Sequence, residues 1–573
     1  MFKQQRSLLV DTILLGIVGA LGAQAFLFLL HWCQTIFLGW VAQQPGLASG
    51  SSATFLPSEL HRVWLIPLST TLGGLLAGLI VYTFAPEAEG HGTDAAVNAF
   101  HNLRGAIRTR VPFVKMVASA ITIGSGGSAG REGPTALISA GIGSIYARKR
   151  GYSDEQTRML LLVGMAAGLS AIFRSPIGTA IFAVEVLYSE TAFESGALLF
   201  TMLGSIVAYA VNGFFVGFQP LFQVPANLAA PRAADYGWYV ILGAVCGLVA
   251  TILPMALYTV RDLFHAIPCR PHFKPAIAGM VVGLVALALP QVLGGGYSWI
   301  QSAINGGIPA DLLLFLALGK IVTFALTIGS GGSGGVFAPS LFTGAMVGGF
   351  LGTLFHQPPA AFAVVGMAAV FGGAARVPIA TLLMVTEMTG GYHLLVAAAL
   401  AVILSTLLQS FLSSFLKYKS LYEAQVPTRA YSPAHSVEQV QIALDLLRTR
   451  GLPSALDGRG LELISFLTSG VPVKLLDGKQ IRIGILRPKS PLAGQSIQAA
   501  GLVERDDLGV ILVLRGDRTL WPHLDLKLEA EDRLVAVTSE AGWSSLADHV
   551  QDVAPAPQTR GSSTPDHGAA RAS

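Results

Sequence analysis

Two glycine-rich segments of this 573-residue chain have the residue types expected of an anion site. They read Thr122-Ile-Gly-Ser-Gly-Gly-Ser-Ala-Gly130 and Thr327-Ile-Gly-Ser-Gly-Gly-Ser-Gly-Gly335. Each leads into a predicted helix with proline in its first turn, Pro134 and Pro339, where the missing N–H costs nothing. A helix N-terminus has free N–H groups and the positive end of the helix dipole. Two such ends aimed at one point would bind an anion with neutral donors.

The two segments differ at one position where chemistry is expected. Glu132 follows the first segment, and an offset of 205 residues places Phe337 opposite it. A carboxylate at this position competes with an anion for the same N–H donors, so Glu132 is predicted to plug the site when ionised and to vacate it when protonated. The alternative is that Glu132 only complements the helix dipole. A charged side chain inside a membrane costs roughly 2.5–3.5 kcal/mol on insertion scales and is functional by default, which favours the gate.

Further matches at nearly the same offset indicate an internal duplication. Val163-Gly-Met-Ala-Ala167 returns as Val365-Gly-Met-Ala-Ala369, and Glu185 aligns with Glu387. Broken segments at corresponding places in two halves of a membrane protein predict a binding site near the bilayer midplane. The duplication disfavours two other interpretations of the glycine segments. One is a helix-packing seam of the GxxxG kind. The other is the G-x-S-x-G hydrolase motif, which needs a preceding strand and a His/Asp pair.

The elements that must position these segments are membrane helices. Only 12% of the residues are charged and 52% are hydrophobic, which excludes a water-soluble enzyme. About 20 apolar residues span a bilayer, and the runs of sufficient length are Leu8–Trp32, Val63–Phe84, Ala197–Phe218, Trp238–Val260 and Leu394–Phe415. Several others are short or interrupted by Gly and Pro, which is tolerated only inside protein or beside a water-filled cavity.

The distribution of charge divides the chain. Residues 1–430 hold 38 of the 70 charged residues and residues 431–573 hold 32, so a membrane body precedes a soluble domain. We expect two inverted repeats, about 1–220 and 221–430, then a regulatory domain over 431–553 and a disordered tail over 554–573. Basic residues flank both ends of the body, which predicts a multi-pass protein of the cell inner (plasma) membrane with both termini cytoplasmic.

Composition also limits the other ligands. The net charge of +4 gives no nucleic-acid signature. Three scattered cysteines match no metal spacing and no disulfide framework. We therefore expect the lipid bilayer as a partner, no metal, no cofactor and no enzymatic activity.

Three motifs resemble the signature segments of the CLC family of chloride channels and proton-coupled chloride antiporters. They are Gly130-Arg-Glu-Gly-Pro134, Gly335-Val-Phe-Ala-Pro339 and, after Lys417, Ser420-Leu-Tyr422. The resemblance covers about residues 1–425. It implies an all-α membrane fold of many short and tilted helices in an antiparallel inverted repeat, and a homodimer with one pore per subunit.

The resemblance also implies the site residues. Chloride or a similar small anion would be held by the Val336 and Phe337 amides and the Tyr422 hydroxyl, with Glu132 as the external gate. By their positions in the matching motifs, His91, Gly92, Arg131 and Gly133 are further candidate anion-binding residues.

The chain departs from the family at two places. His91 stands where members usually have a serine whose hydroxyl touches the anion, so either the imidazole or only the backbone N–H would serve. Antiporters of the family commonly carry two adjacent acids at the end of one helix, and the second relays protons. Here Val186 occupies the relay position after Glu185, whose match to Glu387 suggests helix capping or pairing with Arg174.

The C-terminal domain is similar to the TrkA-C (RCK C-terminal) module. The stretch from Ile481 to Ile497 predicts a strand, a turn and a helix start, and Leu508–Leu514 and Leu534–Val537 predict further strands. The resemblance implies a small cytoplasmic α/β domain that binds a small-molecule regulator or stabilises a dimer.

Together these features favour chloride transport through a pore gated by Glu132. Val186 favours a passive voltage- or pH-gated channel. The alternative is a chloride/proton antiporter with a substituted internal relay, and a membrane-embedded enzyme is a remote third possibility.

Overall fold

A computed structural model of the whole chain describes residues 2–44, 62–225, 228–429, 432–435, 473–474, 480–488, 490–502, 508–515, 518–520 and 525–552. The chain forms two compact units, Met1–Arg429 and Ala430–Ser573. Each is considered by itself below.

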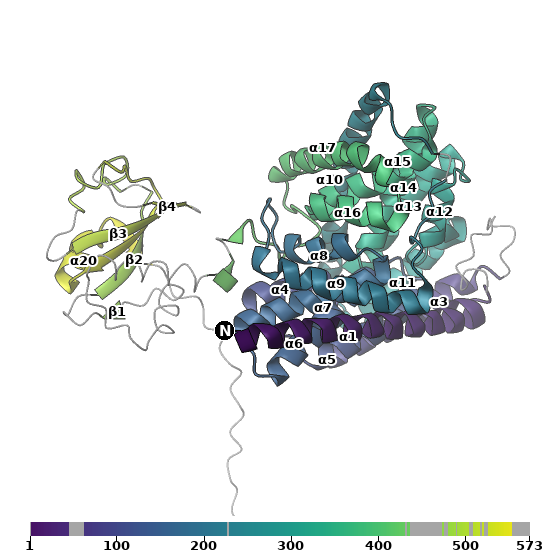
Figure 1. Cartoon of the computed structure of the whole chain (residues 1–573), viewed down its shortest axis with the longest axis horizontal. Coiled ribbons are helices and arrows are strands. Elements are labelled where there is room, and N and C mark those ends of the chain that lie inside the picture. Colours follow the sequence, from purple (N-terminus) through teal and green to yellow (C-terminus); the bar gives the residue numbers. More distant parts are fainter. Residues whose placement is uncertain are drawn as a thin grey trace, which may run out of the picture. The chain divides into compact units, whose positions relative to one another are not determined.

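The first unit consists of helices (Figure 1). These are α1 (Phe2–Gln34), α3 (Leu65–Phe84), α4 (Thr93–Asn102), α5 (Arg110–Gly124), α6 (Glu132–Lys149), α7 (Asp154–Phe173), α8 (Pro176–Glu185), α9 (Ser195–Val216), α10 (Tyr236–Ala266), α11 (Lys274–Ala288), α12 (Tyr297–Ile304), α13 (Ala310–Gly329), α14 (Phe337–Leu354), α15 (Pro359–Ala375), α16 (Pro378–Thr389) and α17 (Leu395–Ser414). Among the described residues, nine helices are long and apolar enough to cross a membrane. The five predicted spans fall in α1, α3, α9, α10 and α17.

The duplicated segments form duplicated structure. The first glycine segment joins α5 to α6 and the second joins α13 to α14. Helices α6 and α14 begin at Glu132 and Phe337, the two residues that the offset of 205 pairs. The predicted first-turn prolines, Pro134 and Pro339, lie at the third residue of their helices.

The two halves also cap each other's helices. The Glu185 carboxylate, at the end of α8, accepts the N–H groups of Ile379 and Ala380 in the first turn of α16, at 3.2 and 2.7 Å. Glu387 in α16 accepts those of Ile177 and Gly178 in α8, at 3.2 and 2.9 Å. An acid at a helix N-terminus satisfies orphan donors and complements the dipole, so both glutamates cap helices, as the sequence suggested.

The alternative pairing of Glu185 with Arg174 is wrong. Arg174 instead donates from its guanidinium to the Gln219 carbonyl at 2.8 Å. It terminates α7 in the left-handed conformation (φ 55°), as Arg376 terminates α15 (φ 56°). The Glu185 carboxylate is held by backbone N–H groups, and it forms no ion pair within the described part of the chain.

The second unit contains a small mixed α/β fold. Its strands are β1 (Val473–Lys474), β2 (Gln480–Leu486), β3 (Leu508–Arg515), β4 (Arg518–Leu520), β5 (Arg533–Thr538) and β6 (Val550–Asp552). They form one sheet in the order β1-β2-β5-β3-β4, and β6 pairs with β2. Helix α20 (Glu540–Leu546) contributes Trp543 and Leu546 to the core of this unit.

The predicted strands of this unit are present, and one local prediction is wrong. Residues 490–502 form successive turns instead of a helix start. Their backbone groups bond to another segment: the Gly494 N–H donates to the Leu528 carbonyl at 2.7 Å and the Ile497 N–H to the Leu526 carbonyl at 2.9 Å. Tertiary pairing therefore overrides the local helix signal. The predicted disordered tail lies outside the described residues.

Candidate anion pathway

The two glycine segments meet at their ends. The Gly130 N–H donates to the Gly335 carbonyl at 2.8 Å, and the Gly335 N–H donates to the Gly130 carbonyl at 2.7 Å. Helices α6 and α14 begin two residues later on either side of this pair. The helix ends that the sequence predicted to converge therefore do converge, one from each half.

Glycine is required here by close backbone approach. A Cβ on Gly133 would lie 3.0 Å from the Gly335 Cα and would collide with the His91 carbonyl. At Gly126 and Gly331 the backbone has φ of +105° and +95°, which L side chains rarely adopt. The glycine pattern thus serves the close contact of three backbone segments at one point.

Two buried lysines, which sequence reasoning missed, fix the loops that precede α4 and α12. These loops bond the glycine segments in turn, through the Gly90 N–H to the Gly332 carbonyl and the Gly294 N–H to the Gly126 carbonyl. The Lys115 ammonium donates to the Ala88 and Gly90 carbonyls at 3.0 and 2.6 Å. The Lys320 ammonium donates to the Val292 and Gly294 carbonyls at 2.8 and 2.6 Å. Both lysines are fully buried. Their sequence separation of 205 residues is the signal that could have revealed them.

A small cavity lies beside the helix ends. Its volume, about 10 Å³ for the centre of a water-sized sphere, admits about one water-sized particle. It is lined by Thr93, Glu132, Gly133, Leu169, Phe173, Phe182, Val336, Phe337 and Tyr422. The lining therefore brings together the first residues of α4, α6 and α14, side chains of α7 and α8, and a tyrosine that follows α17.

Glu132 is the acidic residue of this lining. Its side chain is 1% exposed, and among the described residues neither carboxylate oxygen has a hydrogen-bond partner. A buried polar group without a partner costs free energy, so its burial calls for an explanation such as a functional role or an occupant of the cavity.

Five of the predicted site residues line the cavity, and three do not. Those in the lining are Glu132, Gly133, Val336, Phe337 and Tyr422. The His91 ring lies behind Tyr422, with ring centroids 5.4 Å apart, and within the described part of the chain its Nδ1 has no hydrogen-bond partner. Gly92 and Arg131 are the N-cap residues of α4 and α6, and the Arg131 guanidinium stacks on the Tyr297 ring at 4.4 Å.

Apolar residues that the sequence did not single out complete the lining. Phe337 packs against Phe173 and Phe371, with ring centroids 4.3 and 4.1 Å apart. Phe182 lies at 6.5 Å from Tyr422 by the same measure. These side chains sit in predominantly apolar stretches of their helices, where nothing in the sequence separates a cavity wall from ordinary core.

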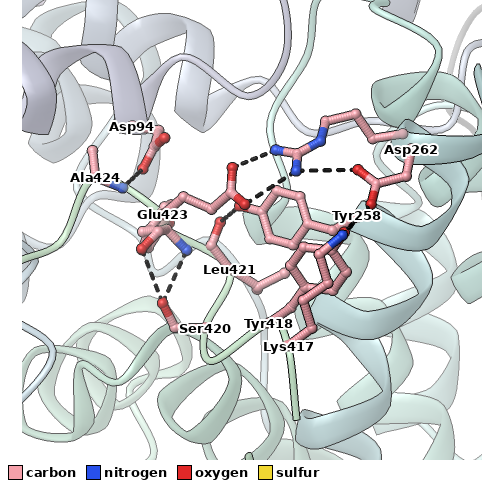
Figure 2. Close-up of polar contacts among 11 residues, drawn as sticks. Asp94, Tyr258, Asp262, Lys417, Tyr418, Ser420, Leu421, Glu423 and Ala424 are labelled. Atoms are coloured by element: carbon pink, nitrogen blue, oxygen red, sulfur yellow. Dashed lines mark hydrogen bonds and ion pairs between the residues drawn. The ribbon is translucent and has the colours of Figure 1, made fainter. Parts of the chain in front are cut away.

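The Tyr422 segment is tied to α10 by polar contacts, as Figure 2 shows. The Tyr258 hydroxyl donates to the Leu421 carbonyl at 2.7 Å. The Arg261 guanidinium bonds the Glu423 carboxylate, with one contact at 3.1 Å, and also contacts Asp262. Tyr422 itself is 2% exposed. Anchors on both sides of Tyr422 hold its ring at the cavity.

Val186, at the position of the missing relay, caps the end of α8. It is fully buried, and its carbonyl accepts the Gln425 side-chain amide at 3.1 Å. An aliphatic side chain cannot carry a proton, so Val186 cannot act as a proton relay at this position.

Comparisons with known proteins agree with this architecture. The family model described as "Voltage gated chloride channel" matches residues 73–410, and the TrkA-C domain model matches residues 485–550. The chain is 30% identical over 406 residues to the H(+)/Cl(-) exchange transporter ClcA of Vibrio cholerae, which covers 69% of this chain and 84% of the relative. It is also 30% identical over 409 residues to ClcA of Citrobacter koseri, with 69% and 83% covered.

Solved structures share the fold. A slow cyanobacterial Cl-/H+ antiporter superimposes with a TM-score of 0.63 at 23% identity, covering 72% of this chain and 96% of that one. A CLC-type fluoride/proton antiporter gives 0.63 at 22% identity, covering 75% and 99%. The family match spans more than half of the chain, so this multi-pass membrane protein belongs to the CLC family of chloride channels and transporters and carries a TrkA-C domain after its membrane unit.

Proposed function

We propose that the protein exchanges chloride for protons across the cell inner membrane, through one pathway in each subunit of a homodimer. The observation that carries this proposal is the buried, unpartnered Glu132 carboxylate in a cavity where two helix N-termini meet. The names of the relatives at 30% identity, which are exchange transporters, support exchange over passive conduction.

The geometry suits a small anion. Val336 and Phe337 open α14, so their N–H groups are among the orphan donors of that helix. Donors of this kind are neutral, and a site that binds with dipoles instead of a full charge releases its ion readily. Tyr422 also lines the cavity and supplies a hydroxyl, and the anion would occupy the cavity among the three.

Glu132 links this anion to a proton. When ionised, its carboxylate takes the same N–H donors and excludes a second negative charge from the cavity. When protonated, it loses that competition and leaves the cavity to chloride. One side chain that alternates between these states couples proton binding to anion passage, which is the requirement for exchange.

Passive conduction is the second candidate, and Val186 is the observation that favours it. It was the leading interpretation of the sequence, and the exchange transporters among the relatives favour the alternative. The positive residues at both ends of the membrane unit support cytoplasmic termini. The TrkA-C domain supports regulation by a small cytoplasmic ligand.

The two candidates separate in proteoliposomes that contain the full chain. With high chloride inside and a valinomycin-clamped voltage, exchange drives protons into the vesicles against their own gradient, in a fixed ratio to chloride efflux. Chloride efflux with no proton movement would establish the passive channel. Vesicles that move neither ion would contradict anion transport altogether.

A further inference from the structure

We propose that Asp94 is the internal proton carrier of this protein, in place of the acid that is missing at Val186. The inference rests on the proposed exchange function, which needs a group that passes protons between Glu132 and the face of the membrane where the first unit ends. It concerns an acid at a different position, on α4 instead of at the end of α8.

The first support is location. Asp94 directly follows Thr93, which lines the cavity together with Glu132. The Asp94 Oδ1 atom accepts the N–H of Ala424 at 2.8 Å, and Ala424 is two residues beyond the cavity tyrosine, Tyr422. Figure 2 shows the Asp94 carboxylate reaching toward Ala424 from the neighbouring element. Asp94 thus bridges the two segments that carry the cavity's hydroxyl groups.

The second support is access. Asp94 is half-buried, and the neighbouring Glu423 and Arg261 side chains are 42% and 27% exposed. The residue therefore lies between an enclosed cavity and a surface that water reaches. The hydroxyls of Thr93 and Tyr422 stand on the cavity side, where each can accept one proton and release another within a hydrogen-bonded chain.

The third support is that Asp94 is not neutralised by a cation. In the described ranges, no Lys, Arg or His atom lies within 4 Å of its carboxylate, and its single hydrogen bond is the one from Ala424. The acids around it are engaged: Glu423 bonds Arg261, and Asp262 bonds Lys417 at 2.7 Å. A carboxylate fixed by a cation gives up its charge reluctantly, whereas a carboxylate with one backbone donor can titrate.

The charged and titratable groups facing Asp94 come from three segments. Tyr422 and Glu423 face it from the segment after α17, and Tyr258 and Arg261 face it from α10. The ordinary alternative is that Asp94 only complements the α4 dipole, since it lies in the first turn of that helix. That role predicts effects on stability and none on the ratio of protons to chloride.

In the cycle, the Asp94 carboxylate takes one proton from water at the inner face and becomes neutral. It then gives that proton, through the Thr93 or Tyr422 hydroxyl and a cavity water, to the Glu132 carboxylate. Asp94 returns to its ionised form, Glu132 becomes neutral, and one proton has crossed the cavity. This sequence moves a proton outward, from the inner face toward Glu132, and the reverse sequence moves a proton inward.

The test is the chloride-driven proton uptake of the full chain in proteoliposomes. Asp94→Asn keeps an oxygen for the Ala424 N–H and removes only the titration, so we expect chloride efflux to persist and proton uptake to be lost. Asp94→Glu should restore proton uptake. Glu190→Gln removes an exposed acid and should keep the ratio of the parent protein.

The outcomes divide cleanly. An unchanged proton-to-chloride ratio in Asp94→Asn would overturn the carrier role. Should Asp94→Asn lose chloride flux as well, Asp94→Glu decides: retained coupling supports the carrier, and joint failure assigns Asp94 to structure. A parent protein that moves chloride without protons would refute exchange itself, before any variant is compared.

Discussion

Removal of the Tyr422 side chain should weaken chloride binding by a defined amount. Tyr422 is 2% exposed and lines the cavity, while the hydroxyl group of Tyr258 and the ion pair of Arg261 hold its backbone from outside. The Tyr422→Ala variant therefore loses the side chain and keeps the anchors of the segment. A hydrogen bond to a charged group is worth roughly 1.5–3 kcal/mol, which corresponds to a loss of chloride affinity of roughly 10- to 150-fold.

Titration calorimetry of the detergent-solubilised protein with chloride measures this loss directly. Tyr422→Phe keeps the ring contacts with His91 and Phe182 and removes only the hydroxyl, so it should account for most of the change. Tyr392→Phe, which alters an exposed tyrosine, is the matched control and should bind as the parent does. If Tyr422→Ala bound chloride with parental affinity, the assignment of this cavity to the anion would be wrong.

Three further predictions follow from the contacts of single residues. Glu132→Gln should make chloride flux insensitive to pH, because an amide cannot titrate, and a retained acid dependence of flux would contradict the gate. Glu185→Ala should lower the thermal stability of the membrane unit, by roughly 1.5–3 kcal/mol for each hydrogen bond lost from a charged acceptor, whereas Glu190→Ala on the surface should have little effect. In the second unit, Arg515 bonds the fully buried Asp532 at 2.8 Å, and this contact raises the pKa of Arg515 above its ordinary value. The guanidinium therefore stays charged in neutral and mildly alkaline buffers, and its stabilisation is lost only at strongly alkaline pH. Hydrogen-exchange protection of β3 and β5 should accordingly be lower in Arg515→Ala than in the parent at every pH in the neutral and mildly alkaline range.

The sequence predicted the meeting point of the two halves because duplication leaves a record at a fixed offset. Glu132 and Phe337 occupy equivalent helix starts, and Glu185 and Glu387 occupy equivalent caps, as their spacing indicates. Glycine and proline strongly restrict or permit particular backbone conformations, so turns and helix starts in segments rich in them can be predicted from the sequence.

The remaining parts of the site depend on tertiary contacts. Thr93, Phe173 and Phe182 have no local pattern that separates them from buried core, and only the packing of their helices brings them to the cavity. Residues 490–502 show the same limit in the second unit, since their backbone bonds to residues 526 and 528 and forms turns. The relation of Asp94 to Ala424 likewise required the fold.

The reciprocal bonds between Gly130 and Gly335 constrain how the transporter can turn over. Many secondary transporters expose their substrate alternately to each side by rocking one repeat against the other around a fixed centre. In this protein main-chain hydrogen bonds join the two repeats at the point where α6 and α14 begin. Lys115 and Lys320 stabilise the adjoining loops by bonding the Gly90 and Gly294 carbonyls. Separating the halves would leave two buried N–H groups and two buried C=O groups without partners, so under the proposed function we expect this contact to persist through the cycle. We therefore expect the access of ions to the cavity to change through small movements of side chains and short helix ends. Such movements would leave the packing of the two repeats unaltered.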